Sequence, residues 1–316
     1  MSTASYNCPC GGGPLKFSGE SGKLECTACG NNYEPEALEM MTPEESIDEI
    51  TFANDAKRFD TGEAGMRAYL CKNCGAELMA DETTAAECPY CGSPTILPDR
   101  IEGGVKPEKV IPFVVTKEQA QKQFEDYFKG KRLLPNIFLN GRNRISEMRR
   151  LYVPYWLFSC DACADMVYDA EKVRTEQKGE WEITRTKHYL VRRRGGMRFK
   201  NIPVDGSIKM DDKLTESLEP YDLSAAIPFQ SAVLAGAMAD HADADCDACE
   251  KRAVERSVEQ TMLDTVRDYD TVSERSRRII AERGSATPAL LPVWLMTTVK
   301  EGKTYTFAVN GQTGKL

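Results

Sequence analysis

The chain has 316 residues, of which 41% are hydrophobic and 28% are charged, and its formal net charge is −8 at pH 7. This length suits two or three domains, and the negative charge opposes nucleic-acid binding by the protein as a whole. The longest apolar run, 225–239, is shorter than the roughly 20 residues that a membrane-spanning helix needs. The first residues, MSTASYNCPC, lack the basic and apolar regions of a signal peptide. We therefore expect a cytoplasmic protein whose thiols stay reduced.

The 12 cysteines all occur in close pairs, a pattern typical of metal sites in a reducing compartment. Six pairs can supply three sites of four thiolates each. The candidate metal ligands are Cys8, Cys10, Cys26, Cys29, Cys71, Cys74, Cys88, Cys91, Cys160, Cys163, Cys246 and Cys249.

Residues 1–34 are predicted to form a first zinc ribbon. The motif CTACG (26–30) is a metal knuckle, in which the glycine permits a left-handed turn after the second cysteine. The motif CPCG (8–11) is one residue shorter, so its ligand geometry is looser. The sequence GESGK between them lacks the earlier glycine and the Ser or Thr of a phosphate-binding loop, and it is predicted to be a hairpin turn.

An acidic helical connector is predicted at 35–67. Residues 31–56 contain eight acids and no Lys or Arg, and Thr42-Pro43 is typical of a helix start. A second zinc ribbon is predicted at 68–98, where CKNCG (71–75) and CPYCG (88–92) form two complete knuckles. A closed set of four soft thiolates favours zinc and a structural role for the metal.

Residues 108–316, after a linker rich in Gly and Pro, are expected to form one α+β domain. Strands are predicted at 110–115, 151–170, 181–194, 197–204, 289–299 and 303–309, with a hairpin turn at Gly195-Gly196. Helices are predicted from Thr116 to about 129, at 211–218 and at 250–269. Ala120, Phe124, Tyr127 and Phe128 are predicted to face the core, as are Val254, Val258, Met262 and Val266. The expected fold class is thus α+β: two N-terminal zinc ribbons followed by a mainly antiparallel β domain with a few helices.

The tetrapeptide CDAC occurs at 160–163 and again at 246–249, without the knuckle glycine. The first copy lies in a predicted strand, where positions i and i+3 face opposite sides unless the strand bulges. The second copy precedes a helix, whose N-terminus favours thiolate. A third four-thiolate zinc site and reduced thiols without metal both remain open, and redox chemistry is a further alternative.

A basic stretch lies at 185–200, interleaved with aromatic residues and free of acids. It can pair with the acidic segment before residue 57, or it can contact nucleic acid or anionic lipid headgroups. The cations of this candidate partner patch are Arg185, Lys187, Arg192, Arg193, Arg194, Arg198 and Lys200.

Several long motifs resemble one bacterial family across nearly the whole chain. They are IPFVVTKEQA, YVPYWLF, NIPVDGSIKMDDKLTESLEPYDL, LAGAMAD, LLPVWLM and YTFAVNGQTGK, together with CKNCGAELMADETTAAECPYCG. They are similar to proteins described as transcription-factor-IIB-type zinc-ribbon-containing, which are sometimes mislabelled as primosomal or helicase-like. The resemblance implies partners among phage-shock-type and SPFH-type membrane-associated proteins. It also implies that related chains continue past the last motif, so a C-terminal segment beyond Leu316 is a second expected route to the membrane.

The sequence offers little for catalysis. The chain has two histidines, His188 and His241, and it lacks the GxSxG, HExxH and complete Walker motifs. We therefore expect a non-enzymatic zinc-binding adaptor or scaffold that bridges protein partners in a membrane-linked stress assembly, with no small-molecule substrate. The alternative is a zinc-ribbon protein that binds nucleic acid through the basic stretch.

Overall fold

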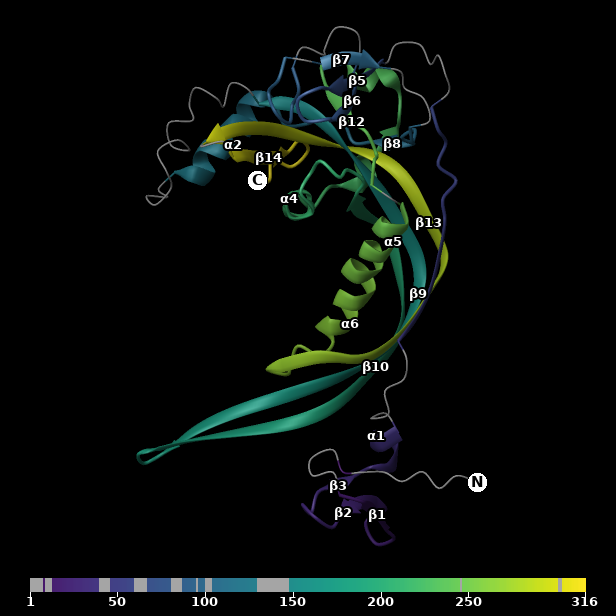
Figure 1. Cartoon of the computed structure of the whole chain (residues 1–316), viewed down its shortest axis with the longest axis vertical. Helices are drawn as coiled ribbons and strands as arrows, with labels where there is room; N and C mark the ends of the chain where they lie inside the picture. The colour runs from purple at the N-terminus through teal and green to yellow at the C-terminus, as the bar shows by residue number, and fades with distance from the viewer. Residues whose placement is uncertain are drawn as a thin grey trace. The chain divides into compact units, whose positions relative to one another are not determined.

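The computed structural model describes residues 8, 13–39, 46–59, 67–80, 87–94, 96–99, 104–129, 148–244, 246–300 and 303–316. They form an α+β protein made mostly of strands with a few helices, as expected (Figure 1). The strands are β1 (Leu15–Ser18), β2 (Lys23–Cys26), β3 (Asn32–Tyr33), β4 (Ile47–Ala53), β5 (Arg67–Cys71), β6 (Glu77–Ala80), β7 (Ile96–Asp99), β8 (Lys109–Val110), β9 (Arg149–Lys178), β10 (Trp181–Asp205), β11 (Ile227–Pro228), β12 (Met238–Asp240), β13 (Thr271–Lys300) and β14 (Lys303–Asn310). The helices are α1 (Pro35–Glu39), α2 (Lys117–Phe128), α4 (Asp212–Ser217), α5 (Cys246–Val254) and α6 (Gln260–Asp264), with a π-helical segment η5 (Glu255–Glu259) and short 3-10 turns η3 (Leu223–Ala225) and η4 (Ser231–Leu234).

The chain divides into two compact units. The first comprises Met1–Thr51, Asp161–Met197 and Ser257–Glu282, and the second comprises Phe52–Cys160, Arg198–Arg256 and Arg283–Leu316. The strands β9, β10 and β13 contribute residues to both units. The predicted ribbon, connector and α+β segments follow sequence motifs, and a division by compactness does not test them.

One sheet contains most of the strands. Its order is β11-β8-β13-β9-β12-β6-β5-β7, with β10 paired to β9 and both β4 and β14 paired to β13. The pairs β5–β6, β5–β7, β6–β12 and β13–β14 are antiparallel, whereas β12 runs parallel to β9 and β8 runs parallel to β13. A separate sheet contains β1, β2 and β3.

In the first unit, the segment 19–22 turns between β1 and β2, with Gly22 at φ +67°. This confirms the hairpin turn predicted from GESGK. The predicted helical connector is wrong at β4, which is a strand paired with β13, while its expected start at Thr42-Pro43 lies outside the described residues. Cross-strand charge pairs favour the strand, because Asp48 bonds Arg277 at 2.7 Å and Glu49 lies 3.8 Å from Arg278.

The turn between β9 and β10 lies at Gly179 (φ +68°), in the gap between the strands predicted at 151–170 and 181–194, and the hairpin predicted at Gly195-Gly196 is wrong. β10 continues through both glycines as one strand. Side-chain pairs across the two strands are centred on Gly179. Arg192 donates two hydrogen bonds to Asp165, at 2.7 and 2.6 Å, and the Thr175 and Thr184 hydroxyls lie 3.3 Å apart. These cross-strand contacts decide the register, which the local glycine signal does not.

A helix is confirmed over most of the predicted range 250–269: it begins at Cys246, contains a π-helical segment in its middle and ends at Asp264. Its predicted apolar stripe is fully buried. No helix in the described part of the chain is both long and apolar enough to span a membrane.

The core of the second unit is built on β9 and β13. Residues 151–158 of β9 are all buried, because the sheet continues on both sides of this strand and both of its faces are covered. α2 packs against this core through Ala120 and Phe124, beside Trp294 and Val309. Tyr127 is 48% exposed, so its predicted inward position is wrong: the short helix uses only a narrow apolar stripe.

Helix caps and the C-terminal hairpin follow the sequence closely. Thr116 and Gln119 form a capping box at the start of α2, and Asp211 caps α4. β13 and β14 pair antiparallel from Val293↔Asn310 to Lys300↔Lys303, as predicted for the C-terminal hairpin.

Two glycine substitutions test the position of the β9–β10 turn. Gly179→Ala should lower the free energy of unfolding by about 1 kcal/mol, because alanine is strained at positive φ. Gly195→Ala should be neutral or slightly stabilising, because Gly195 lies within a strand and an added Cβ meets nothing within 4 Å. Denaturant titration measures the free energy of unfolding of both variants. If Gly195→Ala were the more destabilising of the two, the turn would lie at Gly195.

Candidate metal centres

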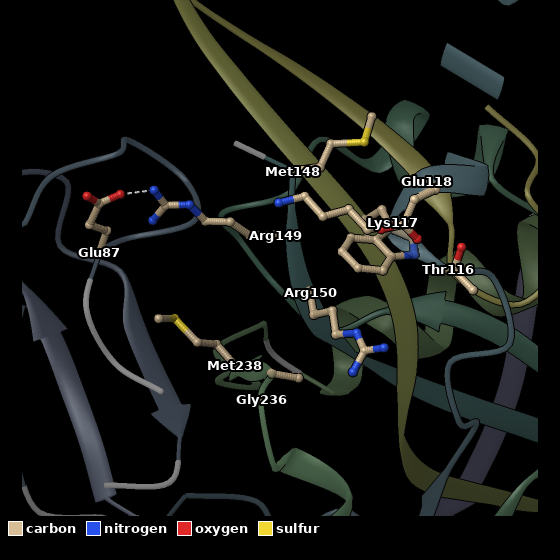
Figure 2. A pocket seen from close by; sticks show the side chains of 11 residues that line it. Glu87, Thr116, Lys117, Glu118, Met148, Arg149, Arg150, Gly236 and Met238 are labelled. Atoms are coloured by element: carbon tan, nitrogen blue, oxygen red, sulfur yellow. Dashed lines mark hydrogen bonds and ion pairs between the residues drawn. The ribbon is translucent and has the colours of Figure 1, made fainter. Parts of the chain in front are cut away.

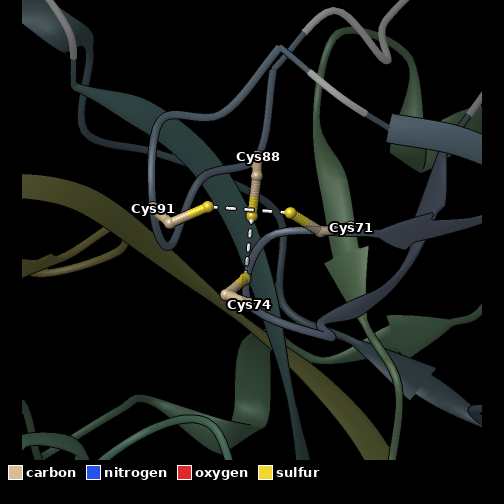
Figure 3. Close-up of side chains that lie close together, drawn as sticks. All are labelled: Cys71, Cys74, Cys88 and Cys91. Atoms are coloured by element: carbon tan, nitrogen blue, oxygen red, sulfur yellow. Dashed lines mark hydrogen bonds between the residues drawn. The ribbon is translucent and has the colours of Figure 1, made fainter.

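The second cysteine cluster, Cys71, Cys74, Cys88 and Cys91, lies in the second unit (Figure 3). The Cys71 and Cys91 sulfurs are 3.6 Å apart, as are those of Cys74 and Cys88, and all four lie within 4.8 Å of one another. A tetrahedral ion with metal–sulfur bonds of about 2.3 Å requires sulfur–sulfur separations of about 3.8 Å. The four thiols therefore have a spacing that can hold a metal ion.

The backbone turns that orient these thiols have the predicted knuckle conformation. The Gly75 amide donates to the Cys71 carbonyl at 2.7 Å, and the Gly92 amide donates to the Cys88 carbonyl at 2.9 Å. Both glycines have positive φ, +69° and +70°. A residue with a side chain is strained in this conformation, which is why glycine follows each CxxC pair.

The protonation of these thiols opposes metal binding at low pH. Burial raises the pKa of Cys74 to about 11 and also raises the pKa of Cys88. Burial acts in the same direction on Cys91, but hydrogen bonds from the Asn73 side chain and the Ser93 amide outweigh it and lower its pKa to about 7. A metal ion must displace the remaining protons, so the affinity of the cluster for metal decreases as the pH is lowered.

The first cysteine cluster, Cys8, Cys26 and Cys29, lies in the first unit. The Cys8 and Cys29 sulfurs are 3.5 Å apart, and Cys8 also lies 3.4 Å from the Tyr33 hydroxyl. Gly30 has φ +72° and donates to the Cys26 carbonyl at 2.9 Å, which repeats the knuckle of the second cluster. The fourth predicted ligand, Cys10, lies outside the described residues.

The structure does not gather the CDAC thiols into a cluster of this kind among the residues it describes. Cys160 is buried and Cys163 exposed, as alternation along an unbroken strand predicts. Cys249 lies in the first turns of α5, and its thiol donates to the Asp205 carbonyl at 3.4 Å. The Cys246 thiol lies 3.9 Å from the Glu250 carboxylate.

A buried polar group joins the second cysteine cluster to β12. Asp240, at the end of β12, is 2% exposed and accepts hydrogen bonds from the Tyr90 and Ser207 hydroxyls. Tyr90 lies between two of the clustered cysteines. The Lys209 amine also donates to the Cys74 carbonyl at 2.8 Å. Neither Asp240 nor Ser207 was predicted from the sequence. The signals there are only a Tyr inside CPYC and an Asp-Gly-Ser turn.

Two buried carboxyl groups in this region resist ionisation. Burial raises the pKa of Asp240 to about 6, against the hydrogen bonds from Ser207 and Tyr90 that lower it. Burial likewise raises the pKa of Asp205 to about 7. One Asp205 oxygen accepts from the Ser207 amide at 2.9 Å, but the other has no hydrogen-bond partner among the described residues. An ionised Asp205 is therefore poorly compensated.

The basic stretch lies along β10 and does not form a hairpin. In the first unit, Asp165 of β9 neutralises Arg192, and Arg193 donates to the Thr265 carbonyl at 3.4 Å. Successive side chains of a strand alternate between its faces, so the cations are divided between two sides. The expected pairing with the acidic segment is not seen in the described residues of that segment. Asp48 and Glu49 pair with the β13 arginines instead.

Neither histidine lies in a candidate metal cluster. His188 is 72% exposed and lies 3.0 Å from Glu171, and His241 is half-buried beside Gly104.

The strand-rich fold and the two cysteine clusters define the class of the molecule. It is an α+β protein whose cysteines can hold metal. No family model matches the sequence, and no solved structure matches it. The chain is 34% identical over 315 residues to the uncharacterized protein YdjG of Bacillus subtilis (strain 168), an alignment that spans 99% of this chain and 88% of that protein. The chain therefore belongs to the same family as YdjG.

Metal content tests the two clusters directly. The purified chain should carry two metal ions, and Cys88→Ser should reduce this to one, because a three-thiolate remnant binds far more weakly. Cys163→Ser and Cys246→Ser are matched controls and should leave the content unchanged. Elemental analysis measures all four proteins, and the loss of one ion in either control would instead place a metal on the CDAC thiols.

Asp205 should make the protein less stable as pH rises. The unfolded carboxyl loses its proton near pH 4 and the folded one near pH 7, so the folded state binds more protons between these values and stability falls across this window. Asp205→Asn removes this penalty and should raise the free energy of unfolding by on the order of 2–4 kcal/mol at pH 8, but change it little at pH 4. The control Asp126→Asn changes an exposed carboxyl group on α2 and should have little effect on the free energy of unfolding at either pH. If Asp205→Asn raised the free energy of unfolding equally at pH 4 and pH 8, the raised pKa of Asp205 would be contradicted.

Proposed function

We propose that the protein is a zinc-binding adaptor, with structural zinc in both cysteine clusters. Soft thiolates in a tetrahedral arrangement favour zinc over the harder divalent cations. In the second cluster all four coordination positions are supplied by cysteines, which leaves none for a water or a substrate. This closed ligand set is the observation that carries the proposal, because catalytic zinc keeps an open position.

A non-enzymatic role is supported by the surroundings of the titratable groups. Histidine, the usual general base near neutral pH, occurs only at 188 and 241, and neither residue is a member of a cysteine cluster among the described residues. The buried Asp205 and Asp240 contact Ser207, whose hydroxyl donates to Asp240. Among the described residues the Ser207 hydroxyl has no histidine partner that could act as its base.

The first unit offers aromatic surface to a protein partner. Trp181 begins β10 next to the turn at Gly179, and its side chain is 76% exposed. Phe17 of β1 is 63% exposed on the sheet that carries the first cysteine cluster. Exposed aromatic side chains on rigid strands are typical anchors of protein interfaces. The identity of the partners, membrane-associated proteins of the phage-shock or SPFH kind, rests on the family resemblance of the sequence motifs.

Nucleic-acid binding is the weaker proposal. The cations of β10 lie on both faces of the strand, and Asp165 engages two of them, Arg192 at 2.6 Å and Arg194 at 3.9 Å. A phosphate backbone attracts cations that line up on one surface.

Purification of the tagged protein from its native cells tests the adaptor proposal. We expect a defined set of proteins to copurify with the wild type, to be lost with Trp181→Ser and to be retained with Glu182→Gln, which changes a neighbouring exposed residue. Nucleic acid that copurifies instead, and that salt removes, would favour the alternative. Metal content should be the same in all three proteins, which separates a lost interface from a lost fold.

A further inference from the structure

A pocket of about 600 Å³ opens in the second unit beside the start of α2 (Figure 2). Four separate segments supply its walls in addition to α2: Glu87, the start of β9, the turn before β12, and Trp294 of β13. The apolar part of the lining comes from Met148, Met238 and Trp294. None of these residues belongs to a cysteine cluster, although Glu87 directly precedes Cys88.

Three cations line the pocket: Lys117, Arg149 and Arg150. The Arg150 guanidinium lies over two aromatic rings, 5.3 Å from the centre of Phe113 and 5.4 Å from that of Trp294. This stacking fixes the guanidinium plane while leaving its N–H groups for a ligand. Among the described residues, the two acids of the lining, Glu87 and Glu118, form no ion pair with Arg150.

Arg149 contributes a partly desolvated charge. It forms an ion pair with Glu87, and burial lowers its pKa. Charge interactions of a guanidinium withdrawn from water are stronger than those of an exposed one. An incoming anion would compete with Glu87 for this side chain.

The N-terminus of α2 is already supplied with partners by the chain itself, so the anion preference of the pocket rests on the three cations. Thr116 and Gln119 satisfy each other's amides in a capping box. The Glu118 carboxylate also lies at this end, and its own backbone amide, followed by Thr116, lowers its pKa. The helix end therefore stabilises an anion that the chain itself supplies.

We propose that this pocket binds a phosphate group carried by a ligand with an apolar portion. Two guanidinium groups and an ammonium offer more donors than the two oxygens of a carboxylate can accept, whereas the three terminal oxygens of a phosphate can use them. Trp294 and the two methionines form the wall for the apolar portion. Both a soluble phosphate monoester and the terminal phosphate of a phosphatidic acid headgroup have this chemistry.

Binding is measured with the whole 316-residue chain at an ionic strength of about 0.15 M, where diffuse surface attraction is screened. The soluble probe is inorganic pyrophosphate, followed by calorimetry. The lipid probe is vesicles of phosphatidic acid mixed with phosphatidylcholine, compared in a flotation assay with vesicles of phosphatidylcholine alone. The probe that binds identifies the source of the phosphate.

Four variants decide whether the pocket is responsible. Lys117→Gln and Arg150→Gln should each weaken binding by about tenfold, the usual effect of losing one charge-assisted hydrogen bond. Lys122→Gln removes the same charge from α2 outside the pocket lining and should leave binding unchanged. Glu87→Gln releases Arg149 and should tighten binding, a gain that misfolding cannot produce. The proposal is overturned if neither probe binds, if Lys122→Gln weakens binding as much as Lys117→Gln, or if Glu87→Gln fails to tighten it.

Discussion

The buried carboxyl group of Asp240 joins the second cysteine cluster to the main sheet. It accepts hydrogen bonds from Tyr90, inside the cluster, and from Ser207, which follows β10. Asp240 itself ends β12, a strand that pairs with β6 on one side and with β9 on the other. A buried carboxyl is tolerated only with such partners, so three segments that are distant in the sequence must be in place together. The cluster is therefore part of the core of its unit.

Local motifs were predictable because they need only their own residues. The knuckle glycines at 75 and 92 have the expected conformation, and the helix predicted from Thr116 is present with Thr116 as its cap. The hairpin predicted at Gly195-Gly196 is wrong, because two adjacent glycines are a local turn signal that the long strand β10 overrides. Pairs such as Arg192 with Asp165, 27 positions apart, determine where the chain reverses.

The two CDAC copies illustrate the same limit. At 160–163 the tetrapeptide is part of a strand, with one cysteine buried and the other exposed, and at 246–249 it opens a helix. Four identical residues thus adopt two conformations, which their surroundings select. The phosphate pocket was equally invisible to sequence reading, because five segments between Glu87 and Trp294 build it and no motif relates them. Metal ligands are predictable by spacing, whereas long-range polar contacts are not.

The position of β9 in the sheet has a consequence for the order in which the structure opens. Near its start, β9 is paired with β12 on one side and β13 on the other, and residues 151–158 are buried. Their backbone amides can reach water only after a neighbouring strand has separated. Hydrogen exchange should therefore be slowest here and faster at the sheet edge formed by β7. Opening then proceeds from the sheet edge inward. The strand β9, whose first residues line the phosphate pocket, is the last to be exposed.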